Sequence, residues 1–285
     1  MTKTSLTDRF VLANGVGIPC LGFGTWKIPD GEETIQAVST ALKAGYRHID
    51  TAAAYRNEAG VGQAVRDSGI AREEIFVVSK LRNPDHGYAN AAVAFDKTMA
   101  NLGLDYLDMY MLHWPIAKGH KDHWQQDIVE TWRFFEERYR DGTVKALGVC
   151  NFLPHHLTPL LAEAKERPLV DQIEIHPSFL QQDAVDFCRK EGIQVEAWGP
   201  LANGKLFESV QLRALAAKYD RSVAQLTLRW LLQKDILPLP KSTTPERIAA
   251  NAAVFDFVIS EADMRAIDAV DDCGNSGLFP DTIDF

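Results

Sequence analysis

Short apolar runs and amphipathic stretches alternate along most of the 285-residue chain. In the longer stretches, apolar residues recur at steps of three and four, which indicates helices with one buried face. The predicted helices span 34–43, 89–102, 128–140, 157–164, 182–190 and 223–233. The strand-like runs between them span 20–23, 46–50, 75–79, 107–112, 145–149, 170–174, 193–197 and 235–239. Together they make about eight strand–helix units, the number that closes a parallel barrel.

Several of the strand runs are almost continuously apolar, as expected for strands buried on both faces of a parallel sheet. Asn14-Gly15 lies between apolar residues and predicts a hairpin near the start of the chain. A helix is expected at 261–270, followed by an irregular tail at 272–285. Glycines stand just past four of the predicted helices, at the usual C′ position: Gly45, Gly103, Gly142 and Gly192. The pattern predicts an α/β fold, a single (β/α)8 barrel domain over 1–285 with a hairpin before it and a helix and tail after it.

Composition narrows the classes of function. The chain is 46% hydrophobic and 24% charged, which is ordinary for a globular protein. Its net charge is −9 and no basic cluster interrupts it, so neither nucleic acid nor a membrane surface is an expected partner. No apolar run is long enough to cross a membrane. The four cysteines lack Cys-x-x-Cys spacing and are interpreted as reduced thiols of a cytoplasmic protein.

Several motifs are absent or incomplete. The sequence contains no Gly-x-Gly-x-x-Gly, so a nucleotide would have to bind without the Rossmann fingerprint. There is no Gly-x-Ser-x-Gly nucleophile elbow. His120 and His123 could ligate a metal ion, but the sequence shows no third ligand beside them. We therefore expect no metal site.

Four residues of complementary chemistry fall at or just past the ends of predicted strands: Asp50, Tyr55, Lys80 and His113, here called the quartet. In a parallel barrel the C-terminal strand ends converge on one face, where the chemistry is done. Any one of these residues alone would be interpreted as a loop residue or a buried polar group. A carboxylate, a phenol, an ammonium and an imidazole at successive strand ends predict a shared site.

The quartet could protonate an oxygen atom. A free phenol has a pKa of about 10, and the Lys80 ammonium is expected to lower the pKa of Tyr55. Asp50 would keep Lys80 charged, and His113 could orient a substrate carbonyl by a hydrogen bond. Such a site suits carbonyl reduction, and because no side chain supplies hydride, a nicotinamide is implied. A purely structural Asp–Lys ion pair remains the alternative at this point.

The segment after the last strand run has the features of a phosphate site. Thr244 is a candidate N-cap and Pro245 suits the first helical position. Free N–H groups at a helix start, together with Lys241, Ser242 and Arg247, could bind a phosphate. An arginine there favours the 2′-phosphate of NADP over NAD. On these residues alone, a well-capped surface helix is the alternative.

Taken together, the motifs resemble those of the aldo-keto reductases from about residue 8 to 270. Each is weak by itself, but their order and spacing are specific. They are Leu21-Gly22-Phe23-Gly24-Thr25-Trp26, His48-Ile49-Asp50-Thr51-Ala52, Tyr55-Arg56-Asn57-Glu58, Ser79-Lys80, Leu112-His113-Trp114-Pro115, Gly148-Val149-Cys150-Asn151-Phe152, Gln172-Ile173-Glu174-Ile175-His176-Pro177 and Pro240-Lys241-Ser242. Trp198-Gly199-Pro200-Leu201 resembles the bacterial branch that includes 2,5-diketogluconic acid reductases.

The resemblance implies a monomeric enzyme that binds NADPH or NADP+ on the C-terminal face and reversibly reduces aldehydes and ketones, with Tyr55 as proton donor. The implied cofactor contacts are Gly24, Thr25, Asn151, Gln172, Trp198, Gly199, Leu201, Lys241, Ser242, Thr243, Arg247 and Asn251. The implied substrate contacts are Trp26, Tyr55, His113 and Trp114. A non-catalytic NADPH-binding regulatory subunit on the same barrel is the alternative. Sugar-derived diketones, methylglyoxal-like aldehydes and keto esters all remain open as substrates.

Overall fold

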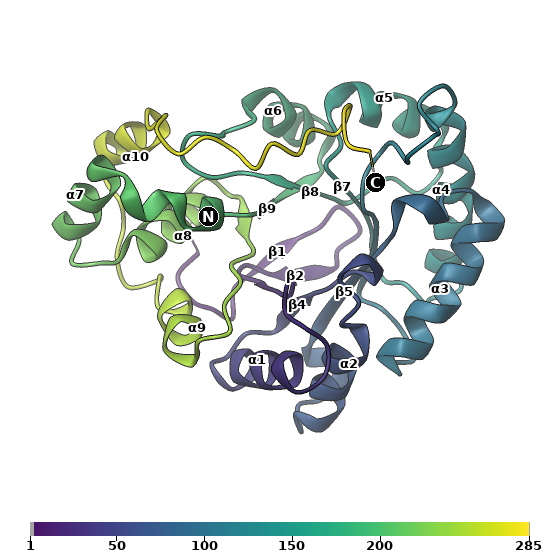
Figure 1. The fold of residues 1–285 in the computed structure, drawn as a ribbon, viewed down its shortest axis with the longest axis horizontal. Helices are drawn as coiled ribbons and strands as arrows, with labels where there is room; N and C mark the ends of the chain where they lie inside the picture. The colour runs from purple at the N-terminus through teal and green to yellow at the C-terminus, as the bar shows by residue number, and fades with distance from the viewer. Residues whose placement is uncertain (1–2, 285) are drawn as a thin grey trace.

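Eight parallel strands form one sheet that closes into a barrel, ringed by helices (Figure 1). The computed structural model describes residues 3–284. The barrel strands are β3 (Phe23–Gly24), β4 (His48–Asp50), β5 (Phe76–Leu81), β6 (Met109–Leu112), β7 (Leu147–Cys150), β8 (Val170–Glu174), β9 (Gln194–Trp198) and β10 (Leu237–Pro238). They are adjacent in the sheet in sequence order. Backbone hydrogen bonds from Gly22 to Pro238 (3.1 Å) and from Gly24 to Pro240 (3.0 Å) join the first strand to the last. The predicted barrel is confirmed.

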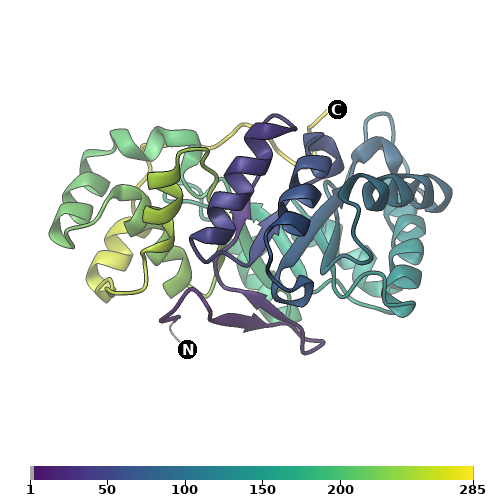
Figure 2. The ribbon, with the colours of Figure 1, turned by 90° about the horizontal axis from the view of Figure 1, so that it is seen from below.

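A two-stranded hairpin precedes the barrel. It pairs β1 (Arg9–Val11) with β2 (Gly17–Pro19) in antiparallel register. Gly15 turns the chain at φ +85°, a conformation that glycine adopts without strain. Figure 2 shows the hairpin on the opposite side of the barrel from the end of the chain. The hairpin is where Asn14-Gly15 predicts it. The first barrel strand, expected at 20–23, begins only at Phe23, because residues 20–22 link β2 to β3.

The helices pack around the outside of the sheet. They are α1 (Glu32–Lys43), α2 (Glu58–Asp67), α3 (Tyr88–Leu102), α4 (Trp124–Arg140), α5 (Pro154–Glu163), α6 (Gln182–Glu191), α7 (Val210–Lys218), α8 (Val223–Gln233), α9 (Pro245–Ala252) and α10 (Glu261–Asp268). The helices that the apolar spacing predicts are confirmed, with ends that shift by up to four residues.

Two helices, α2 and α7, were not anticipated by the spacing. Gly60 and Gly62 weaken the intrinsic helix propensity of α2. Tertiary packing overrides that cost, because α2 lies against the end of α3 and a Cβ at Gly62 would come within 1.9 Å of the Leu102 carbonyl oxygen. In α7 only Leu212 and Ala216 are buried, so its apolar face is too narrow to stand out in the sequence.

The barrel interior explains why the strand runs are apolar on both faces. Every residue of β5, β6, β7 and β8 is buried, because one side packs into the barrel and the other against the helices. No helix between residues 3 and 284 is long and apolar enough to span a membrane.

After α10 the chain crosses the C-terminal face of the barrel past α6 and α5 (Figure 1). The Ser276 backbone N–H and Oγ donate to the two carboxylate oxygens of Glu174 at 2.9 and 2.6 Å. Farther along, His155 Nε2 lies 2.8 Å from Asp281 Oδ1. These contacts anchor the tail over the end of β8. Residues 1, 2 and 285 of the predicted domain lie outside the described residues.

Candidate active site

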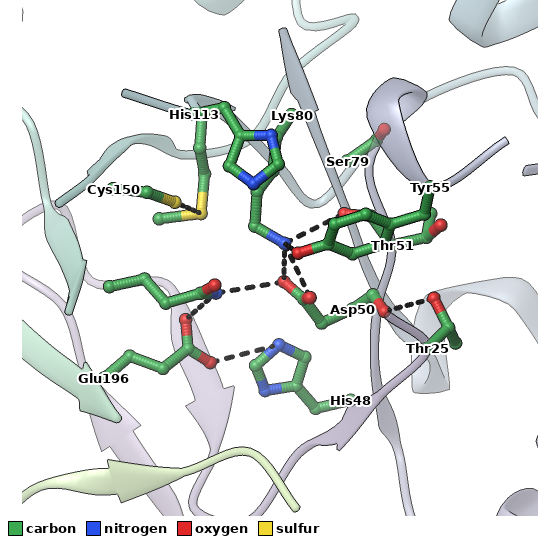
Figure 3. Close-up of polar contacts among 12 residues, drawn as sticks. Thr25, His48, Asp50, Thr51, Tyr55, Ser79, Lys80, His113, Cys150 and Glu196 are labelled. Atoms are coloured by element: carbon green, nitrogen blue, oxygen red, sulfur yellow. Dashed lines mark hydrogen bonds and ion pairs between the residues drawn. The ribbon is translucent and has the colours of Figure 1, made fainter. Parts of the chain in front are cut away.

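The strand register brings the quartet together. Asp50 is the last residue of β4 and Lys80 lies near the end of β5. His113 directly follows β6, and Tyr55 ends a 3₁₀ turn, Ala53–Tyr55, that follows β4. Because all these strands are parallel and adjacent, their C-terminal ends lie side by side. Figure 3 shows the side chains of Asp50, Tyr55 and His113 gathered around Lys80.

Lys80 is the centre of the arrangement. Its side chain is fully buried, and Nζ lies 2.6 and 2.7 Å from the two Asp50 oxygens. Nζ also donates to the Thr51 carbonyl at 3.0 Å and to Tyr55 Oη at 3.3 Å. Since the phenol oxygen accepts from Lys80, its own hydrogen remains free to be donated elsewhere. Thr25 Oγ1 donates to the Asp50 carbonyl at 2.9 Å and so fixes the end of β4.

The charges of this cluster follow from burial and from the ion pair. Burial is the largest single effect and opposes the ammonium charge, but the Asp50 carboxylate, together with Tyr55 and Cys150, raises the pKa of Lys80. Burial also raises the pKa of the Tyr55 phenol, with Lys80 pulling the other way. Lys80 lowers this pKa, as the sequence predicts, but the net shift is upward because desolvation of the phenolate is the larger effect. Tyr55 is protonated at neutral pH and ready to act as an acid.

His113 is the neutral member of the quartet. Burial and the neighbouring Lys80 charge hold the pKa of His113 well below its ordinary value. Its ring lies edge-on to the Tyr55 ring, with centroids 5.5 Å apart. A neutral imidazole beside the phenol can donate one hydrogen bond to an oxygen that Tyr55 also reaches.

A second layer of polar side chains lies deeper in the barrel. Gln172 Nε2 donates to Asp50 Oδ2 and to Glu196 Oε2, each at 3.0 Å. Glu196 Oε1 lies 3.5 Å from His48 Nε2, and both side chains are fully buried. Asp50 thus connects the quartet to a buried network that the sequence did not reveal.

A cavity of about 1070 Å³ opens at the C-terminal face above the quartet. That volume is slightly above the usual range for ligand sites, roughly 300–1,000 Å³. Fifteen of the residues predicted for the site line it: Gly24, Trp26, Asp50, Tyr55, His113, Trp114, Asn151, Gln172, Trp198, Gly199, Leu201, Lys241, Ser242, Arg247 and Asn251. The cavity therefore runs from the quartet to the start of α9.

Three predicted residues lie outside the cavity wall. Thr25 and Lys80 are fully buried beneath it, where they hold Asp50. Thr243 is exposed on the loop before α9 but does not line the cavity. The contacts of Thr25 and Thr243 with the cofactor stay predictions.

Asn151 and Trp198 form a rigid wall above the barrel. Asn151 follows β7 at φ +62°, a left-handed conformation that asparagine tolerates better than most residues. Its Nδ2 donates to the His113 carbonyl at 3.0 Å, and its Oδ1 accepts from Trp198 Nε1 at 2.7 Å. Trp198 stands edge-on to Trp26, with ring centroids 6.5 Å apart. These contacts fix one face of an indole toward the cavity.

At the opposite end, the cavity reaches the N-terminus of α9. This α9 end consists of Lys241, Ser242, Arg247 and Asn251. Thr244 is the N-cap residue and Pro245 the first helical residue, as predicted, but the Thr244 side chain accepts no capping hydrogen bond. The Thr244 N–H donates to Ser242 Oγ at 3.1 Å. Lys241 and Arg247 are exposed and form no ion pair with any residue in the described range 3–284. Two unpaired cations at a helix start suit a phosphate group.

The histidine pair that the sequence singled out does have a third polar neighbour. His120 Nδ1 and His123 Nδ1 lie 2.9 and 2.8 Å from the same oxygen of Asp127, one helical turn into α4. The expectation of no candidate third ligand was wrong, because Asp127 is brought back by the helix. Hydrogen bonds to the carboxylate account for this arrangement, and the positive end of the α4 dipole opposes a cation there.

With the geometry established, comparison with known proteins identifies the family. The family model described as "Aldo/keto reductase family" matches residues 20–272. The chain belongs to this family. It is 45% identical over 282 residues to a glyoxal reductase of Bacillus subtilis (strain 168), covering 99% of each chain. It is 40% identical to the methylglyoxal reductase DkgA of Escherichia coli (strain K12), covering 95% of this chain and 96% of that protein.

A solved structure extends the comparison to the cofactor. The crystal structure of a Gox0644 mutant in complex with NADPH superposes with a TM-score of 0.90, at 36% identity, covering 98% of this chain and 99% of that one. The resemblance inferred from the sequence is confirmed, as is its bacterial branch. This aldo/keto reductase is an enzyme that uses NADPH to reduce carbonyl compounds. The alternative of a regulatory subunit is not favoured.

Some cavity residues were missed by sequence reasoning. Lys27 follows Trp26 and places Nζ 4.3 Å from the centre of that indole ring. Phe207 comes from the loop between β9 and α7, and Leu278 from the C-terminal tail. An exposed phenylalanine before a helix was a weak indication of a pocket wall. Nothing in the local sequence connects Leu278 with this site, because Leu278 lies more than 160 residues after His113.

Proposed function

We propose that Tyr55 is the proton donor of this reductase. The observation that carries the proposal is the hydrogen bond from Lys80 Nζ to Tyr55 Oη at 3.3 Å, with Lys80 itself held by both oxygens of Asp50. As the phenol gives up its proton, the fixed ammonium stabilises the negative charge that develops on Oη. Asp50 keeps the ammonium in place and charged. His113, neutral and adjacent, orients the carbonyl oxygen.

The residues of the cavity fit a nicotinamide dinucleotide phosphate. One end of the cavity has the cationic side chains of Lys241 and Arg247 beside the start of α9. The other end has the Trp198 indole and the amides of Asn151 and Gln172. Trp198 would stack on the nicotinamide, and Asn151 and Gln172 would hold its carboxamide. Lys241, Ser242 and Arg247 would bind the 2′-phosphate, with Asn251 beside the adenine. Gly24, Gly199 and Leu201 would contact the rest of the cofactor along the cavity.

When bound, the reduced nicotinamide supplies the hydride that no side chain can provide. The chain's own groups do the rest: Trp198 presents one face of the bound ring, His113 orients the substrate oxygen, and Tyr55 protonates that oxygen as the carbon accepts hydride. Trp26 and Trp114 wall the substrate side of the cavity. Oxidation of the alcohol would use the same groups in reverse.

For the substrate, we propose small α-oxoaldehydes of the glyoxal and methylglyoxal kind. Two relatives across nearly the whole chain carry names with these substrates. Apolar indole walls beside few polar groups suit a small carbonyl compound. Sugar-derived diketones and keto esters belong in the same test panel.

We further propose a single-domain monomer that works in the cytoplasm. All barrel strands belong to one sheet, and the family model spans nearly all of it. The four cysteines are buried and free, consistent with a reducing compartment. Sedimentation velocity at micromolar protein concentration tests the monomer.

The decisive experiment is the Tyr55→Phe variant, which removes only the phenolic oxygen. Turnover of methylglyoxal should fall about 10³-fold or more, because the proton donor is lost, while the Kd for NADPH stays within about twofold. NADPH absorbance and fluorescence quenching measure the two quantities. Tyr88→Phe is the matched control, since Tyr88 is exposed and does not line the cavity. Unchanged turnover in Tyr55→Phe would falsify the assignment.

A further inference from the structure

Glu196 is a buried carboxyl group that the proposed mechanism does not use. It lies on β9 with its side chain fully buried inside the barrel. Asp50, its carboxyl neighbour through Gln172, is paired with Lys80, whereas no lysine or arginine lies within ion-pair distance of Glu196 among residues 3–284. Its polar neighbours are the Gln172 amide at 3.0 Å and the His48 imidazole at 3.5 Å. In the view of Figure 3, Glu196 and His48 lie on the other side of Asp50 from His113.

The protonation state of this pair follows from its surroundings. Burial, and then the negative charge of Asp50, raises the pKa of Glu196 to about 8. Burial, and then the positive charge of Lys80, lowers the pKa of His48 to about 3. At neutral pH the pair is therefore a carboxylic acid beside a neutral imidazole, and not an ion pair. The acid can offer its proton to His48 and still accept from Gln172 through its other oxygen.

This arrangement fixes which way the Gln172 amide points. Both hydrogens of Nε2 are taken by carboxyl groups, one by Asp50 and one by Glu196. An amide turned the other way would bring Oε1 against two carboxyl groups, of which Asp50 is charged. The orientation therefore leaves Oε1 as the acceptor that Gln172 can offer to a donor in the cavity that it lines.

We propose that Glu196 is a positioning residue, which as a neutral acid holds the Gln172 amide in its working orientation and keeps a second negative charge away from the Asp50–Lys80 pair. The proposal rests on the proton-donor role proposed for Tyr55. Glu196 touches neither substrate nor cofactor. It acts through Gln172 on cofactor placement, and through Asp50 and Lys80 on the acidity of the phenol.

A pH dependence follows from the position of this acid. As pH rises through about 8, Glu196 loses its proton and places a second carboxylate beside Asp50. That charge competes for the Lys80 ammonium and opposes the negative charge that develops on Tyr55 Oη, so turnover falls.

Other titratable groups lie near Glu196. Asp50 forms the ion pair with Lys80, and burial raises the pKa of Asp171, on the neighbouring strand β8, well above its ordinary value. The pKa values of Lys80 and Tyr55 are raised, and that of Cys150 is raised well above its ordinary value. The pKa of His48 is lowered to about 3. A decline in turnover above about pH 8 is therefore assigned to Glu196 by its loss in a variant that cannot titrate at this position.

Glu196→Gln tests this, because the amide has the shape and hydrogen-bonding pattern of the protonated acid. Its oxygen can accept from Gln172 and its NH₂ can donate to His48. We expect kcat within about twofold of wild type near pH 6.5 and no decline between about pH 7 and 9, where the wild type loses about fivefold or more. Glu196→Ala should raise the Kd for NADPH about tenfold and lower kcat at all pH values, because Gln172 loses one of its two acceptors.

The outcomes separate this inference from the proposed function. A Glu196→Gln enzyme with the wild-type decline would overturn the role of Glu196, while an inactive Tyr55→Phe enzyme would still support the proton donor. Activity in Tyr55→Phe would instead remove the basis of both. If Glu196→Gln does not fold, infrared difference spectra of wild type and Glu196→Ala decide. A buried carboxylic acid band that disappears near pH 8 in wild type and is missing in Glu196→Ala supports the inference, and identical bands in the two proteins contradict it.

Discussion

At the quartet, Lys80 and Asp50 are buried and bonded to each other, whereas at the α9 end Lys241 and Arg247 are exposed and unpaired within the described part of the chain. The buried pair is held by parallel strands and by neighbouring hydrogen bonds, so its geometry is present before any ligand arrives. The exposed cations carry flexible side chains that a phosphate can order. One cavity thus joins a preorganised reaction site to an adaptable electrostatic site.

This difference indicates where the stability of the fold and the binding of a ligand depend on the same residues and where they do not. Removing one partner of a buried ion pair leaves a charge without compensation, which damages both folding and chemistry. Removing an exposed cation costs only the contact it makes with a ligand. Substitution at the quartet should therefore lower both stability and turnover, whereas substitution at the α9 end should weaken cofactor binding alone.

The largest effect is expected from Lys80→Met. The change leaves Asp50 buried without its cation, so the free energy of unfolding should fall by about 3–5 kcal/mol. Turnover should fall about 10³-fold because the phenolate loses its stabilising charge. Urea unfolding and NADPH oxidation measure the two effects.

A double variant, Asp50→Asn with Lys80→Met, is the control for that prediction. It leaves no unpaired charge, so part of the stability should return while turnover stays low. Stability no higher in the double variant than in Lys80→Met would contradict the ion-pair explanation.

Arg247→Ala, at the α9 end, should weaken cofactor binding without changing stability. The Kd for NADPH is expected to rise about 10- to 100-fold, as for loss of a charge-assisted hydrogen bond to phosphate. NADH lacks the 2′-phosphate, so its Kd should stay within about twofold. Thermal unfolding should be unchanged. Lys190→Ala, an exposed cation on α6, is the matched control, and equal losses for NADPH and NADH would refute a 2′-phosphate contact.

Acid should destabilise the protein through its buried histidines. Burial lowers the pKa of His48 to about 3 and that of His86 to about 4 in the folded state, below the ordinary histidine value of 6.5. The unfolded chain therefore takes up protons that the folded chain does not, and stability falls as pH drops from about 6.5 to about 4. Urea unfolding across this range measures the slope. His86→Gln should flatten it, whereas Arg247→Ala should follow the wild-type curve.

The smallest effect is expected at the tail. Ser276→Ala removes the hydroxyl that donates to Glu174 at 2.6 Å and loosens the segment that carries Leu278 to the cavity. The KM for methylglyoxal should rise about two- to threefold with NADPH affinity unchanged, the size expected for one partly exposed hydrogen bond. Thr282→Ala, farther along the tail, is the control. If Ser276→Ala changes NADPH affinity and not the KM for methylglyoxal, the tail contacts the cofactor and the prediction is wrong.

Much of the fold could be predicted because it depends on local pattern. Nearly continuous apolar runs indicated β5 and β6, whose residues are all buried, and Asn14-Gly15 indicated the hairpin. The pattern missed α2, where Gly60 and Gly62 oppose a helix and only packing against Leu102 explains them. The site residues at strand ends could also be predicted, because a parallel barrel places the C-terminal ends of its strands together on one face.

By itself the sequence determined the barrel, the quartet and the α9 end, because strand periodicity and the order of polar residues at strand ends are local properties. Only the tertiary structure decided the electrostatics. It showed that burial outweighs Lys80 at the phenol of Tyr55, and that Glu196 lies one amide away from Asp50 without a cation of its own. Desolvation depends on everything packed around a group, and residues 50 and 196 meet only when the barrel closes.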